Sequence, residues 1–199
     1  MSNRCYLVGT DAPTIYPSFV NKPFEPEKDT YLASAGCVPL AWLLLFRPGD
    51  LVTAAFEPEG EKIEVTAPIV RKEKAIANLS EARAWVDPLF VANGGLGYHL
   101  DLFVEHLAGS DHQHLTMEIE EIEALHDDGE VLGHLRACLT ALEARDPRVK
   151  EELVWLSTVL VERRFVTLED AQEGRAEKED QWNFFRLLGE GWEREAAWD

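Results

Sequence analysis

The fold class is decided by a stretch that reads Leu51-Val-Thr-Ala-Ala-Phe56, Glu57-Pro-Glu-Gly60, Glu61-Lys-Ile-Glu-Val-Thr66. Its last part alternates apolar Ile63 and Val65 with charged neighbours, which is typical of a strand with one exposed face. Its first part is also β-prone, and a turn containing proline and glycine separates the two parts. The stretch therefore predicts an antiparallel hairpin.

Helical periodicity begins directly after this hairpin. Between Lys72 and the dipeptide Asp87-Pro88, apolar residues recur three or four positions apart, which predicts a helix. A second helix is expected from about Gly97 to Ala108. Apolar and polar residues then alternate over 115–119, so a half-exposed strand is predicted there.

The N-terminal quarter is less regular. Cys5-Tyr-Leu-Val8 predicts a short strand, and a turn-rich loop with four prolines extends from Gly9 to Lys28. Leu40 to Phe46 is apolar all round, as expected of a buried helix or of a central strand. Because Pro39 suits the first turn of a helix, the helix is favoured, and the turn Arg47-Pro-Gly-Asp50 ends the segment in either case.

The last third of the chain is helical by pattern. An amphipathic stripe runs from Val131 to Leu142, and Asp146-Pro147 opens a further helix. Thr167 can cap another helix, although Gln172 to Asp180 is polar enough to form a solvated segment instead. Together the elements predict a single α+β domain over 1–199, with a mainly antiparallel or mixed sheet of about four strands, about five or six helices, and a C-terminal helical half from about residue 130.

The composition excludes several classes of function. The chain has 199 residues, 46% hydrophobic and 28% charged, as in an ordinary globular protein. Its formal net charge of −18 would repel a phosphate backbone, so nucleic acid is not expected as a partner. The longest apolar run, Cys37 to Phe46, has about half of the roughly 20 residues that a membrane-spanning helix needs, so no membrane contact is expected.

The cysteines and the N-terminal residues indicate the cellular compartment in which the protein is expected. The first residues lack the apolar region of a secretory signal. Cys5, Cys37 and Cys138 are odd in number and far apart, which is typical of reduced thiols. We therefore expect a cytoplasmic protein whose cysteines are small buried residues.

The negative charge is concentrated in the second half. Residues 1–100 hold 12 acids and 9 bases, a net −3, whereas 101–199 hold 25 acids and 10 bases, a net −15. The segment 118–130 contains no Lys or Arg, and its acids are Glu118, Glu120, Glu121, Glu123, Asp127, Asp128 and Glu130. This acidic segment is either a solubilising surface or a docking surface for a basic protein, because clustered carboxylates speed association with cationic partners.

All six histidines fall between His99 and His134, which suggests a test for metal binding. The best ligand set is Asp111, His112 and His114, since alternate residues of an extended segment point the same way and imidazole with carboxylate suits zinc. No second pair with ligand spacing accompanies it. Surface histidines are therefore the preferred interpretation, and no metal or other cofactor is predicted.

Motifs of nucleotide binding and nucleophilic catalysis are missing from the sequence. Asn93-Gly-Gly-Leu-Gly97 precedes a predicted helix and resembles an anion-binding turn, but it lacks the order of a dinucleotide or phosphate loop, so a tight turn is predicted. No Gly-x-Ser-x-Gly occurs, and no cysteine has an obvious base beside it. The sequence therefore predicts no catalytic residue.

Two short motifs carry a resemblance to other proteins. Asn3-Arg4-Cys5-Tyr6-Leu7 begins the chain, and Val38-Pro-Leu-Ala-Trp42 precedes the apolar run. These motifs resemble an uncharacterised family of bacterial proteins that begin Asn-Arg-x-Tyr-Leu, over about the first half of the chain. No catalytic residue is carried over from that family. Small acidic bacterial proteins are often immunity or accessory proteins of toxin systems, and the resemblance implies such a role by association.

Two hypotheses of function follow from these patterns. The first is a cytoplasmic, non-enzymatic interaction module, of the immunity or inhibitor type, that binds a basic partner through the acidic segment. The alternative is a small metal-dependent hydrolase that uses the histidine-rich segment 99–134. Histidines and carboxylates that converge in a pocket would favour the enzyme, whereas an exposed acidic surface would favour binding.

Overall fold

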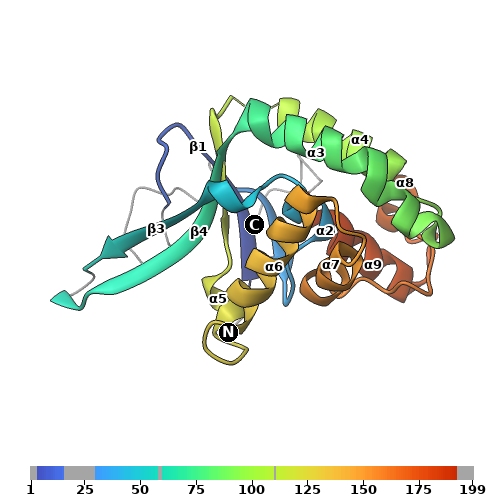
Figure 1. Cartoon of the computed structure of the whole chain (residues 1–199). Coiled ribbons are helices and arrows are strands. Elements are labelled where there is room, and N and C mark those ends of the chain that lie inside the picture. Colours follow the sequence, from blue (N-terminus) through green and yellow to red (C-terminus); the bar gives the residue numbers. More distant parts are fainter. Residues whose placement is uncertain (1–3, 16–29, 58–59, 110, 192–199) are drawn as a thin grey trace.

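A computed structural model of the chain describes residues 4–15, 30–57, 60–109 and 111–191 (Figure 1). These residues form five strands: β1 (Arg4–Thr10), β2 (Thr30–Ala35), β3 (Leu51–Phe56), β4 (Ile63–Arg71) and β5 (His114–Glu118). They also form eight α-helices: α2 (Leu40–Leu43), α3 (Lys72–Val86), α4 (Gly97–Ala108), α5 (Glu120–Glu123), α6 (Glu130–Ala144), α7 (Val149–Ser157), α8 (Leu168–Gln172) and α9 (Lys178–Leu188). The 3-10 segments η1 (Pro48–Asp50) and η3 (Asp87–Asn93) complete the described structure. The predicted α+β class is confirmed.

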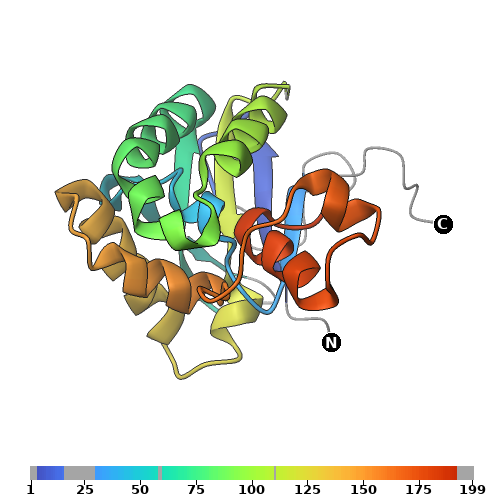
Figure 2. The same ribbon diagram turned by 90° about the vertical axis from the view of Figure 1, so that its right-hand side faces the viewer.

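The strands form one sheet in the order β2-β1-β5-β4-β3, and every neighbouring pair is antiparallel. The predicted hairpin is confirmed as β3 and β4, which project at one edge of the sheet (Figure 1). The helices gather on one side of the sheet, so Figure 2 views the strands through the helical layer. Leu7, Leu115 and Val70 point into this layer and belong to the main hydrophobic core.

The opposite face of the sheet is buried over β5 and partly buried over β4. Ile15 packs against Val65 and Ala67 of β4 in a small separate cluster. Thr116 of β5 lies on this face, is buried, and donates its hydroxyl hydrogen to the carbonyl oxygen of Pro68 at 2.9 Å. The expectation of a half-exposed strand over 115–119 is therefore wrong, because β5 is the central strand and both of its faces are buried.

The counts of strands and helices exceed the predicted ones within the described residues. The additional strand is β2, an edge strand that pairs with β1 and exchanges two backbone hydrogen bonds between Ala33 and Glu190. Among the short helices, α5, which has four residues, was not predicted, whereas α2 after Pro39 and α8 after Thr167 were. A helix as short as α5 carries little periodicity, so it is missed when a sequence is read for repeats of 3.6 residues. Much of the predicted loop from Gly9 to Lys28, part of the turn Glu57–Gly60 and Asn3 of the N-terminal motif lie outside the described residues.

The apolar segment after Pro39 is buried and helical over Leu40–Leu43 only. The turn η1 ends it, and the backbone N–H of Arg47 donates to the Asp50 carboxylate at 2.8 Å. Trp42 is fully buried, and its indole N–H donates to the carbonyl oxygen of Leu188 at 2.9 Å. This bond joins the N-terminal part of the chain to the end of α9.

The C-terminal helices follow the predicted pattern. Thr167 caps α8 by accepting a hydrogen bond from the backbone N–H of Asp170 at 3.2 Å. The polar stretch that follows ends where α9 begins at Lys178. The main core contains residues from Cys5 to Leu188, and the organisation of 1–199 as a single domain stays a prediction. Among the described helices, none is both long and apolar enough to cross a membrane.

The packing of α6 allows a direct test of the helical phase. Leu135 lies at the centre of its buried face and is 1% exposed. Because truncation leaves a cavity in the core, Leu135→Ala is expected to lower the free energy of unfolding by about 2 to 5 kcal/mol, measured by urea denaturation. Glu143→Ala on the exposed face should change it by less than about 0.5 kcal/mol. Equal losses at the two positions would contradict this packing.

Candidate functional site

The acidic segment starts at the end of β5, passes through α5 and ends in the first turn of α6. Its carboxylates fall into two groups with different surroundings. Buried or half-buried positions hold Glu118, Glu120, Glu121 and Glu123. The turn before α6 and the first residue of that helix hold the other three, Asp127, Asp128 and Glu130.

Glu118 is the most enclosed carboxyl group of the segment. It is the last residue of β5, is 4% exposed, and neither carboxyl oxygen has a hydrogen-bond partner among the described residues. Burial, with the nearby carboxylates of Glu120 and Glu121, raises its pKa to about 8. Glu118 is therefore mostly protonated at neutral pH, and it does not belong to an exposed acidic surface.

The two following glutamates lie between α5 and the first strand. Burial raises the pKa of Glu120 to about 7, so this carboxyl group also titrates near neutrality. The carboxylate of Glu121 accepts a hydrogen bond from the backbone N–H of Arg4 at 2.9 Å. Burial, and then the charge of Glu121, raises the pKa of the Tyr6 phenol. These acids are thus part of the packing around β1.

Glu123 satisfies the N-terminus of α6. The N-cap of this helix is Gly129, in a left-handed conformation with φ 77° and without a side chain to accept a hydrogen bond. The carboxylate of Glu123 instead accepts from the backbone N–H of Leu132 at 2.9 Å. A carboxylate at this position also interacts favourably with the positive end of the helix dipole. Its role is therefore structural.

The exposed part of the segment is 124–129, which we call the acidic loop. All six residues of the loop are exposed, and Leu125 has 51% of its surface in solvent. Asp127 and Asp128 form no ion pair with any other residue in the described part of the chain. An exposed leucine beside two unpaired carboxylates combines the apolar and charged groups of a protein docking surface.

A group of rings fixes the acidic loop to the helix behind it. Trp155 of α7 stacks on His134 with ring centroids 3.7 Å apart, and His126 of the loop lies 5.3 Å from the same indole. His134 Nδ1 is 2.7 Å from the carboxylate of Glu152, and His126 Nδ1 is 3.2 Å from that of Glu130. These contacts hold the base of the loop in place.

The proposed metal ligands are not assembled into a cluster. Asp111 is exposed, His112 Nδ1 lies 3.5 Å from the carboxylate of Asp11, and His114 is buried in β5. Across the described ranges, no three His, Cys, Asp or Glu side chains are grouped so that they could hold a metal ion.

His99, another of the six histidines, also has a structural role. His99 is buried in α4, and its Nε2 lies 2.7 Å from the carbonyl oxygen of Val166. Burial lowers its pKa, so the neutral imidazole is favoured there. His99 and His114 are therefore buried, and the interpretation of the histidines as surface residues is wrong for these two. The closeness of the six histidines in the sequence does not produce a metal site in the described residues.

The glycine-rich turn before α4 is occupied by a side chain of the protein itself. The carboxylate of Asp87 accepts hydrogen bonds from the backbone N–H groups of Leu96 and Gly97, the latter at 3.0 Å. A Cβ on Gly95 would lie 3.0 Å from the same carboxylate. The predicted tight turn is confirmed, because the groups that an external anion would need are already bound.

The three cysteines are free and buried. Burial raises the pKa of each thiol, namely those of Cys5, Cys37 and Cys138. A protonated, enclosed thiol is a poor nucleophile. The prediction that the cysteines are small buried residues is confirmed.

The structure contains a pocket that the sequence analysis missed. It has a volume of about 300 Å³ and is lined by Leu160, Lys178, Glu179, Trp182 and Arg186. Trp182 is 56% exposed, which is unusual for an indole. Lys178, Trp182 and Arg186 are spaced four apart, so the sequence did contain a signal, but only the orientation of α9 shows that this stripe faces solvent.

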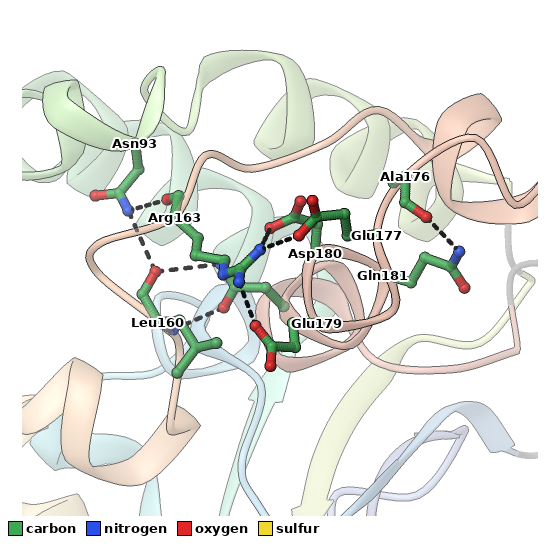
Figure 3. Close-up of polar contacts among 9 residues, drawn as sticks. Asn93, Leu160, Arg163, Ala176, Glu177, Glu179, Asp180 and Gln181 are labelled. Atoms are coloured by element: carbon green, nitrogen blue, oxygen red, sulfur yellow. Dashed lines mark hydrogen bonds and ion pairs between the residues drawn. The ribbon is translucent and has the colours of Figure 1, made fainter.

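An ion-pair network supports one wall of this pocket (Figure 3). The Arg163 guanidinium contacts the carboxylates of Glu177 at 2.8 Å, Asp180 at 3.2 Å and Glu179. The side-chain amide of Asn93 donates to the carbonyl oxygens of Val161 at 3.0 Å and of Arg163 at 2.5 Å. The loop before α8 is thereby tied both to α9 and to the end of η3.

The acidic loop and the pocket on α9 are the two candidate sites of the described structure. Comparisons with protein-family models, with curated proteins and with solved structures find no match to this chain.

Proposed function

We propose that this protein is a cytoplasmic, non-enzymatic interaction module that binds a basic protein partner through the acidic loop. The observation that supports this proposal most directly is the exposed Leu125 beside Asp127 and Asp128, two carboxylates without ion-pair partners in the described chain. Leucine supplies apolar contact area, and the carboxylates attract a cationic surface. An immunity or inhibitor role, in which the loop covers a basic surface of a toxin, is the form of this function that the N-terminal resemblance implies.

The charge of the whole molecule supports the same proposal. The second half of the chain carries a net −15, and the loop lies within it. Such a field raises the rate at which a basic partner arrives, while contacts at the loop decide how long it stays. The acidic loop is anchored by the contact of His126 with Trp155 and, just before the loop, by the hydrogen bond that the backbone N–H of Leu132 donates to Glu123. Because the loop is already anchored, little conformational entropy is lost when it binds a partner.

The experiment measures association and dissociation rates for a basic partner isolated from the source cell by crosslinking. Asp127→Asn with Asp128→Asn is expected to slow association several-fold at low salt and to flatten its salt dependence. Leu125→Ala is expected to speed dissociation by about tenfold, because a buried apolar contact is lost. Folding should be unchanged, since all three side chains are exposed.

A matched control separates the loop from the overall charge. Glu105→Gln with Glu162→Gln removes two exposed carboxylates elsewhere and leaves the same net charge as the loop variant. If both double variants slow association equally, only the total charge matters and the loop is not the interface. Unchanged rates in all loop variants would also contradict the proposal.

A further inference from the structure

The solvent-facing side of α9 carries a stripe of unusual composition for this protein. Lys178, Trp182 and Arg186 are separated by four residues each, so they lie along one face of the helix. The eight steps along the helix from Lys178 to Arg186 give a rise of about 12 Å. The opposite face of the helix is buried through Phe184 and Leu187. We call these three residues the α9 stripe.

The stripe lines a pocket whose remaining walls are set by the protein. Leu160 forms the apolar wall, and its backbone N–H donates to the side-chain oxygen of Asn183 in α9 at 2.7 Å. The Arg163 network shown in Figure 3 holds the same loop against the first turn of α9. The pocket is therefore formed before any ligand arrives, and binding does not have to order this loop.

Two cations of the pocket lining have no ion-pair partner among the described residues, although the protein as a whole is strongly negative. Lys178 and Arg186 form no ion pair with another residue in the part of the chain that the structure describes. The one acid of the lining, Glu179, shares the Arg163 guanidinium with Glu177 and Asp180. Two unpaired cations thus flank an exposed indole, in a chain with 37 acids and 19 bases.

We propose that the α9 stripe binds an acidic peptide segment of another protein, with an apolar side chain on Trp182 and one carboxylate near each of Lys178 and Arg186. The spacing favours a peptide over a nucleotide. Two acidic residues four positions apart in an extended peptide are about 13 Å apart, which matches the length of the stripe. A mononucleotide carries its charge at one end and would leave the second cation unpaired. This site is separate from the acidic loop, whose partner has the opposite charge.

The probe is a fluorescein-labelled peptide with the core Glu-Ala-Leu-Ala-Glu between glycines, titrated by fluorescence anisotropy against the full chain. The expected dissociation constant is below about 1 mM, and Trp182→Ala should raise it about tenfold. A core of Gln-Ala-Leu-Ala-Gln should bind at least about fivefold more weakly than the acidic core. Circular dichroism checks that the variants remain folded, as expected from the exposure of Trp182.

A charge swap gives the sharpest result. Lys178→Glu with Arg186→Glu should weaken the acidic peptide more than tenfold and create binding of a Lys-Ala-Leu-Ala-Lys core. The control, Arg136→Glu with Arg164→Glu, makes the same change in net charge at exposed residues outside the pocket and should alter neither affinity by more than about twofold.

Three outcomes would overturn the proposal. Binding that is unaffected by Trp182→Ala would place the peptide elsewhere. Competition by adenosine monophosphate with an affinity above that of the peptide would assign the pocket to a nucleotide. Self-association of the chain that is lost in Trp182→Ala, measured by sedimentation, would make a second copy of this chain the occupant. None of these results depends on the basic partner of the acidic loop, so the two proposals fail separately.

Discussion

Replacing Glu118 with glutamine is expected to remove a large part of the pH dependence of stability between about pH 5 and pH 8. Burial raises the pKa of this carboxyl group from 4.5 to about 8 in the folded protein. Below pH 4.5, the pKa of a glutamate in the unfolded chain, Glu118 is protonated in both the folded and the unfolded protein, and folding buries no charge. As the pH rises toward 8, folding requires uptake of a proton, so stability falls by up to about 1.4 kcal/mol for each pH unit.

The expected loss for Glu118 over this range is therefore about 3 to 5 kcal/mol. Urea denaturation at pH 5, 6, 7 and 8 measures it, and the Glu118→Gln curve should be much flatter than that of the wild type. Glu120, with a pKa raised to about 7, should leave some residual slope. Glu151→Gln, which removes an exposed carboxylate of α7, should run parallel to the wild type. A Glu118→Gln curve that also runs parallel would show that this carboxyl group is not buried in solution.

The central strand β5 shows why the exposure of Glu118 was predicted incorrectly from the sequence. Alternation of Leu115 and Met117 with Thr116 and Glu118 is the same whether the second face of a strand meets water or other residues. The difference depends on the neighbours in the sheet and on what covers its second face, and neither is encoded locally. The hairpin β3–β4 was predicted correctly because its turn and its partners are adjacent in the sequence.

In the acidic segment too, the local sequence does not show which single residues are exposed. Its acidity and its lack of cations are visible in the sequence, but four of its glutamates serve packing or helix capping in the structure. Only the acidic loop keeps the exposure that docking requires. The capping role of Glu123 depends on a hydrogen bond to a residue nine positions later, Leu132, and a residue type alone does not reveal it. For the same reason the triple change of Glu120, Glu121 and Glu123 to Gln is expected to destabilise the fold as well as to change charge.

The second large effect is expected at the C-terminal end of α9, where Gly189→Ala should lower the free energy of unfolding by about 2 to 6 kcal/mol. Gly189 has φ 89° and ψ 178°, a backbone conformation that only glycine adopts readily. A Cβ at this position would also lie 2.5 Å from Cζ2 of Trp42. The indole cannot retreat, because it is fully buried and its N–H is bonded to the carbonyl oxygen of Leu188.

Two other glycines separate the contributions. Gly174 has φ 66° but nothing within 4 Å of its Cβ position, so Gly174→Ala should show only the backbone cost of about 1 to 2 kcal/mol. Gly133 lies within α6 with open space around it, and Gly133→Ala should stabilise the protein by about 0.5 to 1 kcal/mol. If Gly189→Ala costs no more than Gly174→Ala in urea denaturation, then Trp42 moves aside, and the contact that joins the first helix of the described structure to the last is looser than its geometry implies. A larger cost, as expected, would show that the closure of the core around Trp42 requires a glycine at this position.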